Sequence, residues 1–125
     1  MAATPTKLGF TLLELMVVVA IVGILTALLV PDASRQVSHA KRAQALAQLL
    51  SLQLAQEHHY LVYGHYADLA VLGAAPDNPN YRFHIDDITA TGYRLVATAR
   101  DGHDPECAEL TLTHLDEKAP AQCWR

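Results

Sequence analysis

The apolar run from Phe10 to Val30 constrains this 125-residue chain more than any other feature. About 20 helical residues span the roughly 30 Å of a bilayer's hydrocarbon core, so the run is long enough to cross a membrane. Glu14 is the only charged residue in it, and a carboxylate at the membrane centre costs about 2.5–3.5 kcal/mol on insertion scales. We therefore expect Glu14 to meet a positive partner, and a candidate is the α-amine that cleavage after Gly9 would create at Phe10.

Two simpler interpretations of the run stay open. A secretory signal has an apolar core of about 7–15 residues followed by a cleavage site of small residues. Here the run is longer, and Pro31-Asp32-Ala33-Ser34 is a poor cleavage site. A single-span membrane anchor is the second alternative, and it would leave Glu14 without a role.

The segment Lys7-Leu8-Gly9-Phe10-Thr11-Leu12-Leu13-Glu14 resembles the cleavage and methylation motif of type IV pilins and pseudopilins. The resemblance implies that a prepilin peptidase cuts between Gly9 and Phe10 and N-methylates Phe10. It also implies that Glu14 compensates the Phe10 amine of a neighbouring subunit during filament assembly. Two opposite charges close together in a low-dielectric medium each offset the desolvation cost of the other.

The same resemblance implies three parts of the chain. Residues 1–9 are expected to be the leader peptide, residues 10–30 a transmembrane and assembly helix, and residues 31–125 a globular periplasmic domain. The formal net charge is -4, and this acidity argues against indiscriminate binding to polyanions, which depends on clustered Lys and Arg.

A helical pattern continues to about Tyr63 and becomes amphipathic. The stripe expected to pack on a sheet consists of Leu46, Leu49, Leu50, Leu54 and Leu61, with Gln56 assigned to another face. Gly64 suits a left-handed helix cap. A basic cluster near the start of this half is most simply a solvated face, and it comprises Arg35, His39, Lys41 and Arg42.

Alternating apolar and polar residues predict strands over residues 81–86, 93–99 and 107–113. Three or four antiparallel strands packed on one face of a helix make an α+β fold. Together with the resemblance, this predicts the pilin fold: a long N-terminal helix whose second half packs on a 3-4-stranded antiparallel sheet.

The two cysteines, Cys107 and Cys123, lie in the part expected to be exported, where disulfides are favoured. Two free thiols and a metal site with further ligands remain alternatives. The tail adds a more specific resemblance, because Cys107 before a Leu-Thr strand and the final Cys123-Trp124 are similar to minor pilins of the pilus and competence type. That resemblance implies that the two cysteines pair.

No pattern in the sequence indicates catalysis, a metal or a cofactor. The chain has no Gly-x-x-x-x-Gly-Lys phosphate loop, and His103 with Asp104 reads as an exposed turn pair rather than a catalytic dyad. His58 and His59 are adjacent, so they point about 100° apart on a helix. We therefore expect no enzyme activity and no bound metal.

The predicted function is that of a minor type IV pilin, a structural subunit supporting pilus assembly, adhesion and twitching motility. Its expected partners are other pilins, the prepilin peptidase, the inner-membrane assembly machinery and, before assembly, membrane lipid. One alternative is a DNA-binding pilin for natural competence, which would use Arg82 and Arg94 on one face of the sheet. The other is a type II secretion pseudopilin, in which Asp101, Asp104 and Glu106 could mimic a calcium loop.

Overall fold

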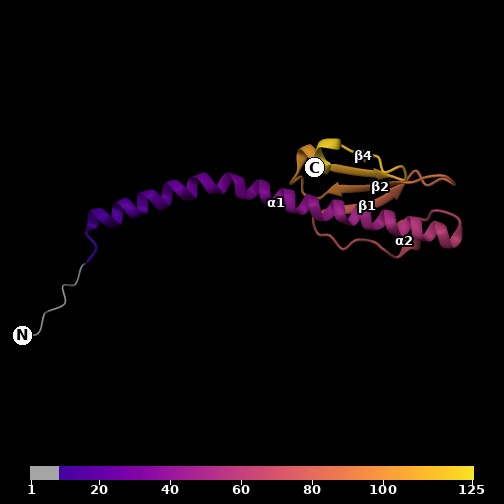
Figure 1. Cartoon of the computed structure of the whole chain (residues 1–125), viewed down its shortest axis with the longest axis horizontal. Coiled ribbons are helices and arrows are strands. Elements are labelled where there is room, and N and C mark those ends of the chain that lie inside the picture. The colour runs from indigo at the N-terminus through magenta and orange to yellow at the C-terminus, as the bar shows by residue number, and fades with distance from the viewer. Residues whose placement is uncertain (1–8) are drawn as a thin grey trace, which may run out of the picture. The chain divides into compact units, whose positions relative to one another are not determined.

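The computed structural model describes residues 9–125, without the side chains of residues 30–33. The predicted leader, apart from Gly9, therefore lies outside the described residues. The chain divides into two compact units, Met1–Gln36 and Val37–Arg125. Figure 1 traces both units, and each is described by itself below.

Helix α1 runs from Leu12 to Tyr63. It begins with a cap that the sequence analysis did not single out: the Thr11 side-chain Oγ1 accepts a hydrogen bond from the backbone N–H of Glu14 at 3.2 Å. A hydroxyl at this position satisfies one of the backbone donors that every helix start leaves free. The helix ends where Gly64 takes a φ of 77°, the left-handed conformation expected of a C-terminal cap.

The rest of the chain forms one antiparallel sheet with the order β1-β2-β3-β4. Its strands are β1 Tyr81–Asp86, β2 Arg94–Ala99, β3 Glu109–Thr113 and the short β4 Lys118–Ala119. A short helix, α2 Leu69–Leu72, precedes the sheet, and two 3-10 turns follow β2 and β4 at Pro105–Cys107 and Ala121–Trp124. Figure 1 shows the sheet lying along the second half of α1. The predicted α+β architecture, a long N-terminal helix with an antiparallel sheet of three or four strands, is confirmed.

The core lies between α1 and the inner face of the sheet. Strand side chains have a period of two, so alternate residues share a face. The inner face consists of residues with almost no exposed surface: Tyr81, Phe83, Leu95, Ala97, Leu110 and Leu112. On α1 the buried residues that meet them are Ala45, Leu49 and Leu52.

The predicted stripe on α1 was therefore largely wrong. Leu49 is buried and Leu46 packs against the core, as predicted. The other three leucines, Leu50, Leu54 and Leu61, are 40%, 72% and 84% exposed. The buried face instead follows residues 45, 49, 52 and 56, and Gln56 has no exposed surface. Its amide Nε2 donates to the Ala67 carbonyl at 2.6 Å, and its Oε1 accepts from the Ala67 N–H at 3.0 Å. Because both of its polar atoms are paired, the helix can bury a glutamine where hydropathy alone favours leucine.

Cys107 and Cys123 form a disulfide with a Cα–Cα distance of 5.8 Å. The bond links the two 3-10 turns, and both cysteines belong to the core cluster, with Trp124 packed against it. A cross-link that closes a loop of this size stabilises a small domain by about 3 kcal/mol in the chain-entropy model.

Candidate functional site: the N-terminal segment and an arginine groove

The predicted cleavage site lies in irregular backbone just before α1. Gly9 and Phe10 have no regular secondary structure, and both are exposed, with Phe10 83% exposed. Exposed irregular backbone is where proteases cut most readily. Gly9 and Phe10 are thus both exposed, and cleavage between them stays a prediction.

Glu14 occupies the first turn of α1, where its backbone N–H is bonded to the Thr11 hydroxyl. A negative charge in the first turn of a helix is favoured by the helix dipole, typically by about 0.3–1 kcal/mol. The pattern Thr11-x-x-Glu14 is the sequence signature of a capping box, so this local role could have been read from sequence. Among the described residues, no ion pair involves Glu14.

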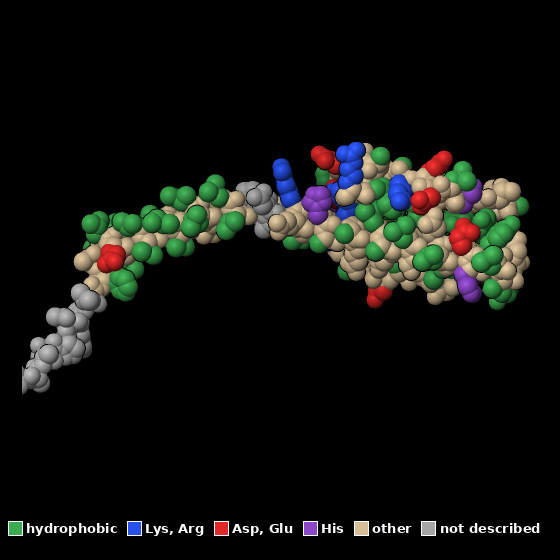
Figure 2. Space-filling model, viewed as in Figure 1, with side chains coloured by type: hydrophobic (Ala, Val, Ile, Leu, Met, Phe, Trp, Pro, Cys, Tyr) green, Lys and Arg blue, Asp and Glu red, His purple; other side chains and the backbone are tan. Residues whose placement is uncertain are grey.

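The N-terminal segment of α1 presents apolar side chains to the outside. Figure 2 shows hydrophobic side chains covering this segment, with an acidic side chain among them. By length and composition alone, the helix could cross a membrane. None of its most apolar stretch is buried within the described structure. A segment of this kind needs lipid or other apolar helices around it.

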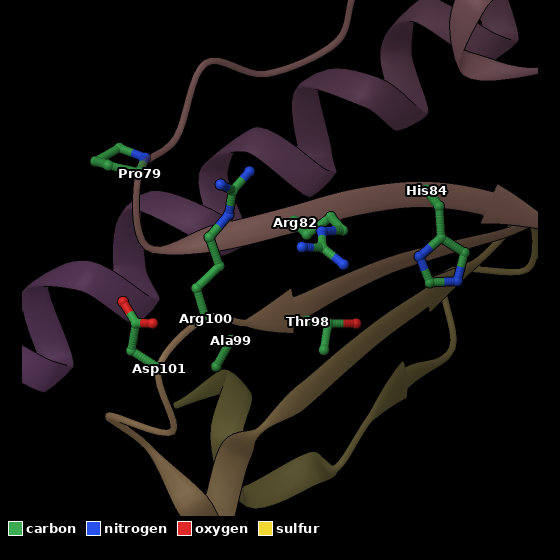
Figure 3. A pocket seen from close by; sticks show the side chains of 7 residues that line it. All are labelled: Pro79, Arg82, His84, Thr98, Ala99, Arg100 and Asp101. Carbon is green, nitrogen blue, oxygen red and sulfur yellow. The ribbon is translucent and has the colours of Figure 1, made fainter.

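The outer face of the sheet, turned away from α1, carries a groove that we call the arginine groove. It has a volume of about 700 Å³ and is lined by Pro79, Arg82, His84, Thr98, Ala99, Arg100 and Asp101. In the strand register Arg82 lies opposite Thr98, and Figure 3 shows their side chains close to those of His84 and Arg100. Arg82 comes from β1, whereas Arg100 and Asp101 directly follow β2.

Arg94 lies on the same outer face, but its charge is already engaged. It is opposite Asp86 in the register, and its Nε and a terminal nitrogen donate to the two Asp86 carboxylate oxygens at 2.7 and 2.8 Å. This two-bond pair holds the pKa of Asp86 below its ordinary value, chiefly through the hydrogen bonds from Arg94. The structure thus places Arg82 and Arg94 on one face, as expected, but gives Arg94 an internal partner.

Arg82 and Arg100 are both exposed, and neither has an ion-pair partner among the described residues. Their guanidinium groups and the Thr98 hydroxyl, all in the groove lining, are donors suited to phosphate or carboxylate oxygens. Asp101 is the one acid in the lining, and it weakens the attraction for anions. Arg100, and not Arg94, is therefore the second unpaired cation beside Arg82 that an anion could contact. The sequence alone does not indicate this, because the pairing of Arg94 with Asp86 depends on the strand register.

Two side chains expected at the surface form a buried pair instead. Arg42 Nε donates to Asp104 Oδ2 at 2.8 Å, and the two side chains are only 13% and 8% exposed. Arg42 is thus not part of a solvated face, and Asp104 is not in an exposed turn pair with His103. The pair also takes Asp104 out of the calcium loop considered with Asp101 and Glu106. No group of three or more potential ligands that could hold a metal occurs within the described residues.

Aromatic rings cluster at the end of α1. Tyr60 stacks on Tyr66 with ring centroids 4.6 Å apart, and Tyr66 meets Tyr93 edge-on at 4.7 Å. The Tyr93 hydroxyl donates to Glu57 Oε1 at 2.9 Å, and burial, followed by this bond, raises the pKa of Tyr93. His59 Nδ1 lies 2.9 Å from the His65 carbonyl oxygen. These contacts account for the aromatic residues as packing around the helix end.

A long N-terminal helix with an exposed apolar segment, joined to an antiparallel sheet and a terminal disulfide, defines a protein of the type IV pilin class. A high-resolution structure of a type IV pilin from Shewanella oneidensis is similar to it, with a TM-score of 0.57, 26% sequence identity, and coverage of 70% of this chain and 97% of that one.

Two curated relatives agree with this class. The type IV major pilin protein PilA of Myxococcus xanthus (strain DK1622) is 36% identical over 109 residues, which is 86% of this chain and 46% of PilA. The type II secretion system core protein G of Escherichia coli (strain K12) is 38% identical over 66 residues, which is 53% of this chain and 46% of that protein. The chain thus spans about half the length of these curated relatives.

Two family models match the chain and identify its family more closely. The prokaryotic N-terminal methylation motif matches residues 5–30. The model described as type IV minor pilin ComP, DNA uptake sequence receptor, matches residues 31–111, which is well over half of the chain. The chain belongs to the type IV minor pilin ComP family.

Proposed function

We propose that this chain is a minor subunit of a type IV pilus that enters the filament through its N-terminal helix. A prepilin peptidase cuts between Gly9 and Phe10 and N-methylates Phe10. Glu14 then pairs with the Phe10 amine of a neighbouring subunit while the apolar helices bundle. The observation that carries this proposal is the exposed apolar segment of α1 with a lone carboxylate in its first turn.

The physical basis is that a paired Glu14 carboxylate has a lower desolvation cost in an apolar helix bundle than an unpaired one. The Glu14 backbone N–H is bonded to the Thr11 hydroxyl, but the Glu14 carboxylate has no ion-pair partner among the described residues. In a low-dielectric helix bundle, an amine a few ångströms away relieves the desolvation cost of both charges. A subunit out of register loses this pairing, so Glu14 both attracts and aligns the incoming chain.

Before assembly, in this proposal, the apolar segment spans the inner membrane and the sheet-bearing part faces the periplasm; afterwards the subunit belongs to a cell-surface fibre. Its partners are other pilins, the prepilin peptidase, the assembly machinery and membrane lipid. Its role is structural, without catalysis. Pilus assembly, adhesion and twitching motility are the processes that it supports.

The test replaces Glu14 with alanine in cells that assemble the fibre. We expect Glu14→Ala to reach the membrane and to be cleaved normally, but to be depleted in sheared filaments. Glu109→Ala, which removes an exposed carboxylate from β3, is the matched control and should be incorporated normally. Incorporation of Glu14→Ala at the wild-type level would contradict charge pairing, and mass spectrometry showing a mature end other than Phe10 would overturn the processing step.

A second function, DNA binding, is favoured by the arginine groove together with the family description. We propose that Arg82 and Arg100 contact DNA phosphates, since both guanidinium groups are exposed and without an ion-pair partner among the described residues. Losing one phosphate contact weakens binding to all sequences and lowers the slope of log affinity against log salt by about one. Arg94 contributes less, because Asp86 already compensates it.

Gel-shift titrations of the processed full chain in non-ionic detergent test this function. Arg82→Ala and Arg100→Ala should each weaken duplex binding and lower the salt slope. The double variant Asp86→Asn with Arg94→Gln removes the internal pair without changing net charge, and it should bind within about twofold of wild type. No binding by wild type at low salt, or equal losses in all three variants, would rule out the groove as the DNA contact.

A further inference from the structure

We propose that His103 is a positioning residue for the arginine groove. Its side chain holds Arg100 in place through a hydrogen bond to the Arg100 backbone carbonyl. The inference rests on the proposed DNA-binding function and adds to it a residue outside the groove lining. His103 ends the turn that follows β2 and is not among the residues that line the groove.

Arg100 is fixed by hydrogen bonds on both sides of its α-carbon. Its N–H donates to the carbonyl oxygen of Asn80 at 2.8 Å, which ties it to the residue before β1. Its carbonyl oxygen lies 2.9 Å from His103 Nδ1. Because a carbonyl oxygen can only accept, Nδ1 carries the imidazole proton and donates it.

The His103 side chain spans a tight turn whose two central residues are both left-handed. Asp101 and Gly102, between the two partners, both take a φ of 60°. A non-glycine residue in this left-handed region is conformationally costly and needs support from its surroundings. The His103 side chain therefore adds a hydrogen bond across the turn that follows Arg100. Figure 3 shows the Arg100 side chain in the groove beside that of Arg82.

His103 is in turn anchored to α1 and to β1. The Ser38 hydroxyl donates to the His103 carbonyl oxygen at 3.4 Å, and the buried pair of Arg42 and Asp104 fixes the next residue. The Tyr81 ring meets the imidazole edge-on, with centroids 5.2 Å apart. The groove arginine is thus connected to the core through a chain of contacts that begins on the helix.

The other imidazole nitrogen of His103, Nε2, makes no hydrogen bond to Arg100. His103 Nε2 is buried and has no hydrogen-bond partner among the described residues, and the same holds for the Tyr81 hydroxyl. Burial, chiefly, and the nearby Asp104 carboxylate raise the pKa of Tyr81, so the phenol keeps its proton. The positioning role therefore belongs to Nδ1, and this assignment separates three substitutions of His103.

Asparagine places its amide nitrogen near the position of Nδ1, glutamine reaches the position of Nε2, and alanine has neither. In gel-shift titrations of the full chain, we expect His103→Ala and His103→Gln to weaken duplex binding by about three- to tenfold. His103→Asn should remain within about twofold of wild type. His58→Ala, which removes an exposed histidine outside the groove, is the matched control and should bind as wild type.

A double variant tests whether His103 acts through Arg100. His103→Ala combined with Arg100→Ala should bind no worse than Arg100→Ala alone, because residues that act as a unit are not additive. Additive losses, equal loss in the asparagine and alanine variants, or wild-type binding by His103→Ala would each overturn the proposal.

NMR relaxation of the Arg100 backbone and guanidinium nitrogens separates this proposal from the DNA function. Greater motion in His103→Ala and His103→Gln, but not in His103→Asn, supports positioning even if wild type fails to bind DNA. Unchanged Arg100 motion in all three variants refutes positioning even if the groove arginines prove essential for binding.

Discussion

Gln56 offers a sharp quantitative test of the packing between α1 and the segment that follows it. Its side chain has no exposed surface and pairs with both the N–H and the carbonyl of Ala67, itself only 6% exposed. Gln56→Leu keeps a similar size and adds apolar character, yet leaves both Ala67 groups unpaired. Two buried unsatisfied groups cost about 2–6 kcal/mol together. Burying leucine returns about 1.5–3 kcal/mol, so we expect a net loss of about 2 kcal/mol.

The assay is urea unfolding of the full chain in non-ionic detergent, followed by the fluorescence of Trp124, the chain's single tryptophan, which packs against the core. Gln53→Leu is the matched control, one turn earlier on the same helix. Its amide makes only a 3.5 Å bond to Asp116 at the exposed surface, so its free energy of unfolding should change by less than about 1 kcal/mol. Equal stability of Gln56→Leu and wild type would refute the argument that the paired amide stabilises this junction.

Two further predictions concern the sheet and its cross-link. Because the folded pKa of Asp86 lies below its ordinary value of 3.8, ionised Asp86 stabilises the fold above that pH, and this contribution is lost as pH falls through the lower folded pKa. Arg94→Gln should therefore make the free energy of unfolding depend less steeply on pH below about pH 4. An unchanged pH dependence would contradict the pairing of Asp86 with Arg94. Relative to oxidised wild type, Cys123→Ser should lower the free energy of unfolding by about 3 kcal/mol. An equal loss in wild type under reducing agent would assign the effect to the bond between Cys107 and Cys123.

The sequence patterns that succeeded are those read over short distances. Alternation over residues 81–86 predicts β1 because strand side chains change faces at every residue, and the burial of Tyr81 and Phe83 follows that alternation. The apolar run with Glu14 predicts the N-terminal part of α1 for a similar reason, since composition alone is sufficient over 20 residues.

The failures lie where a residue's surroundings come from elsewhere in the chain. The buried face of α1 includes Gln56 because a peptide eleven positions later pairs with it, and no helical periodicity contains that information. Arg42 meets Asp104 across 62 positions, so a charge that looked solvated is buried. Arg94 was a reasonable candidate for a ligand contact until the register placed Asp86 opposite it.

The disulfide has a mechanical consequence for any fibre that contains this subunit. Cys123 follows β4 directly through the last 3-10 turn, and β4 has only two residues. A pull applied beyond Cys123 reaches Cys107 through the covalent bond, which diverts the load around β4 and its few hydrogen bonds. The final strand is thereby shielded from peeling under tension, and the force enters the sheet at the base of β3 instead.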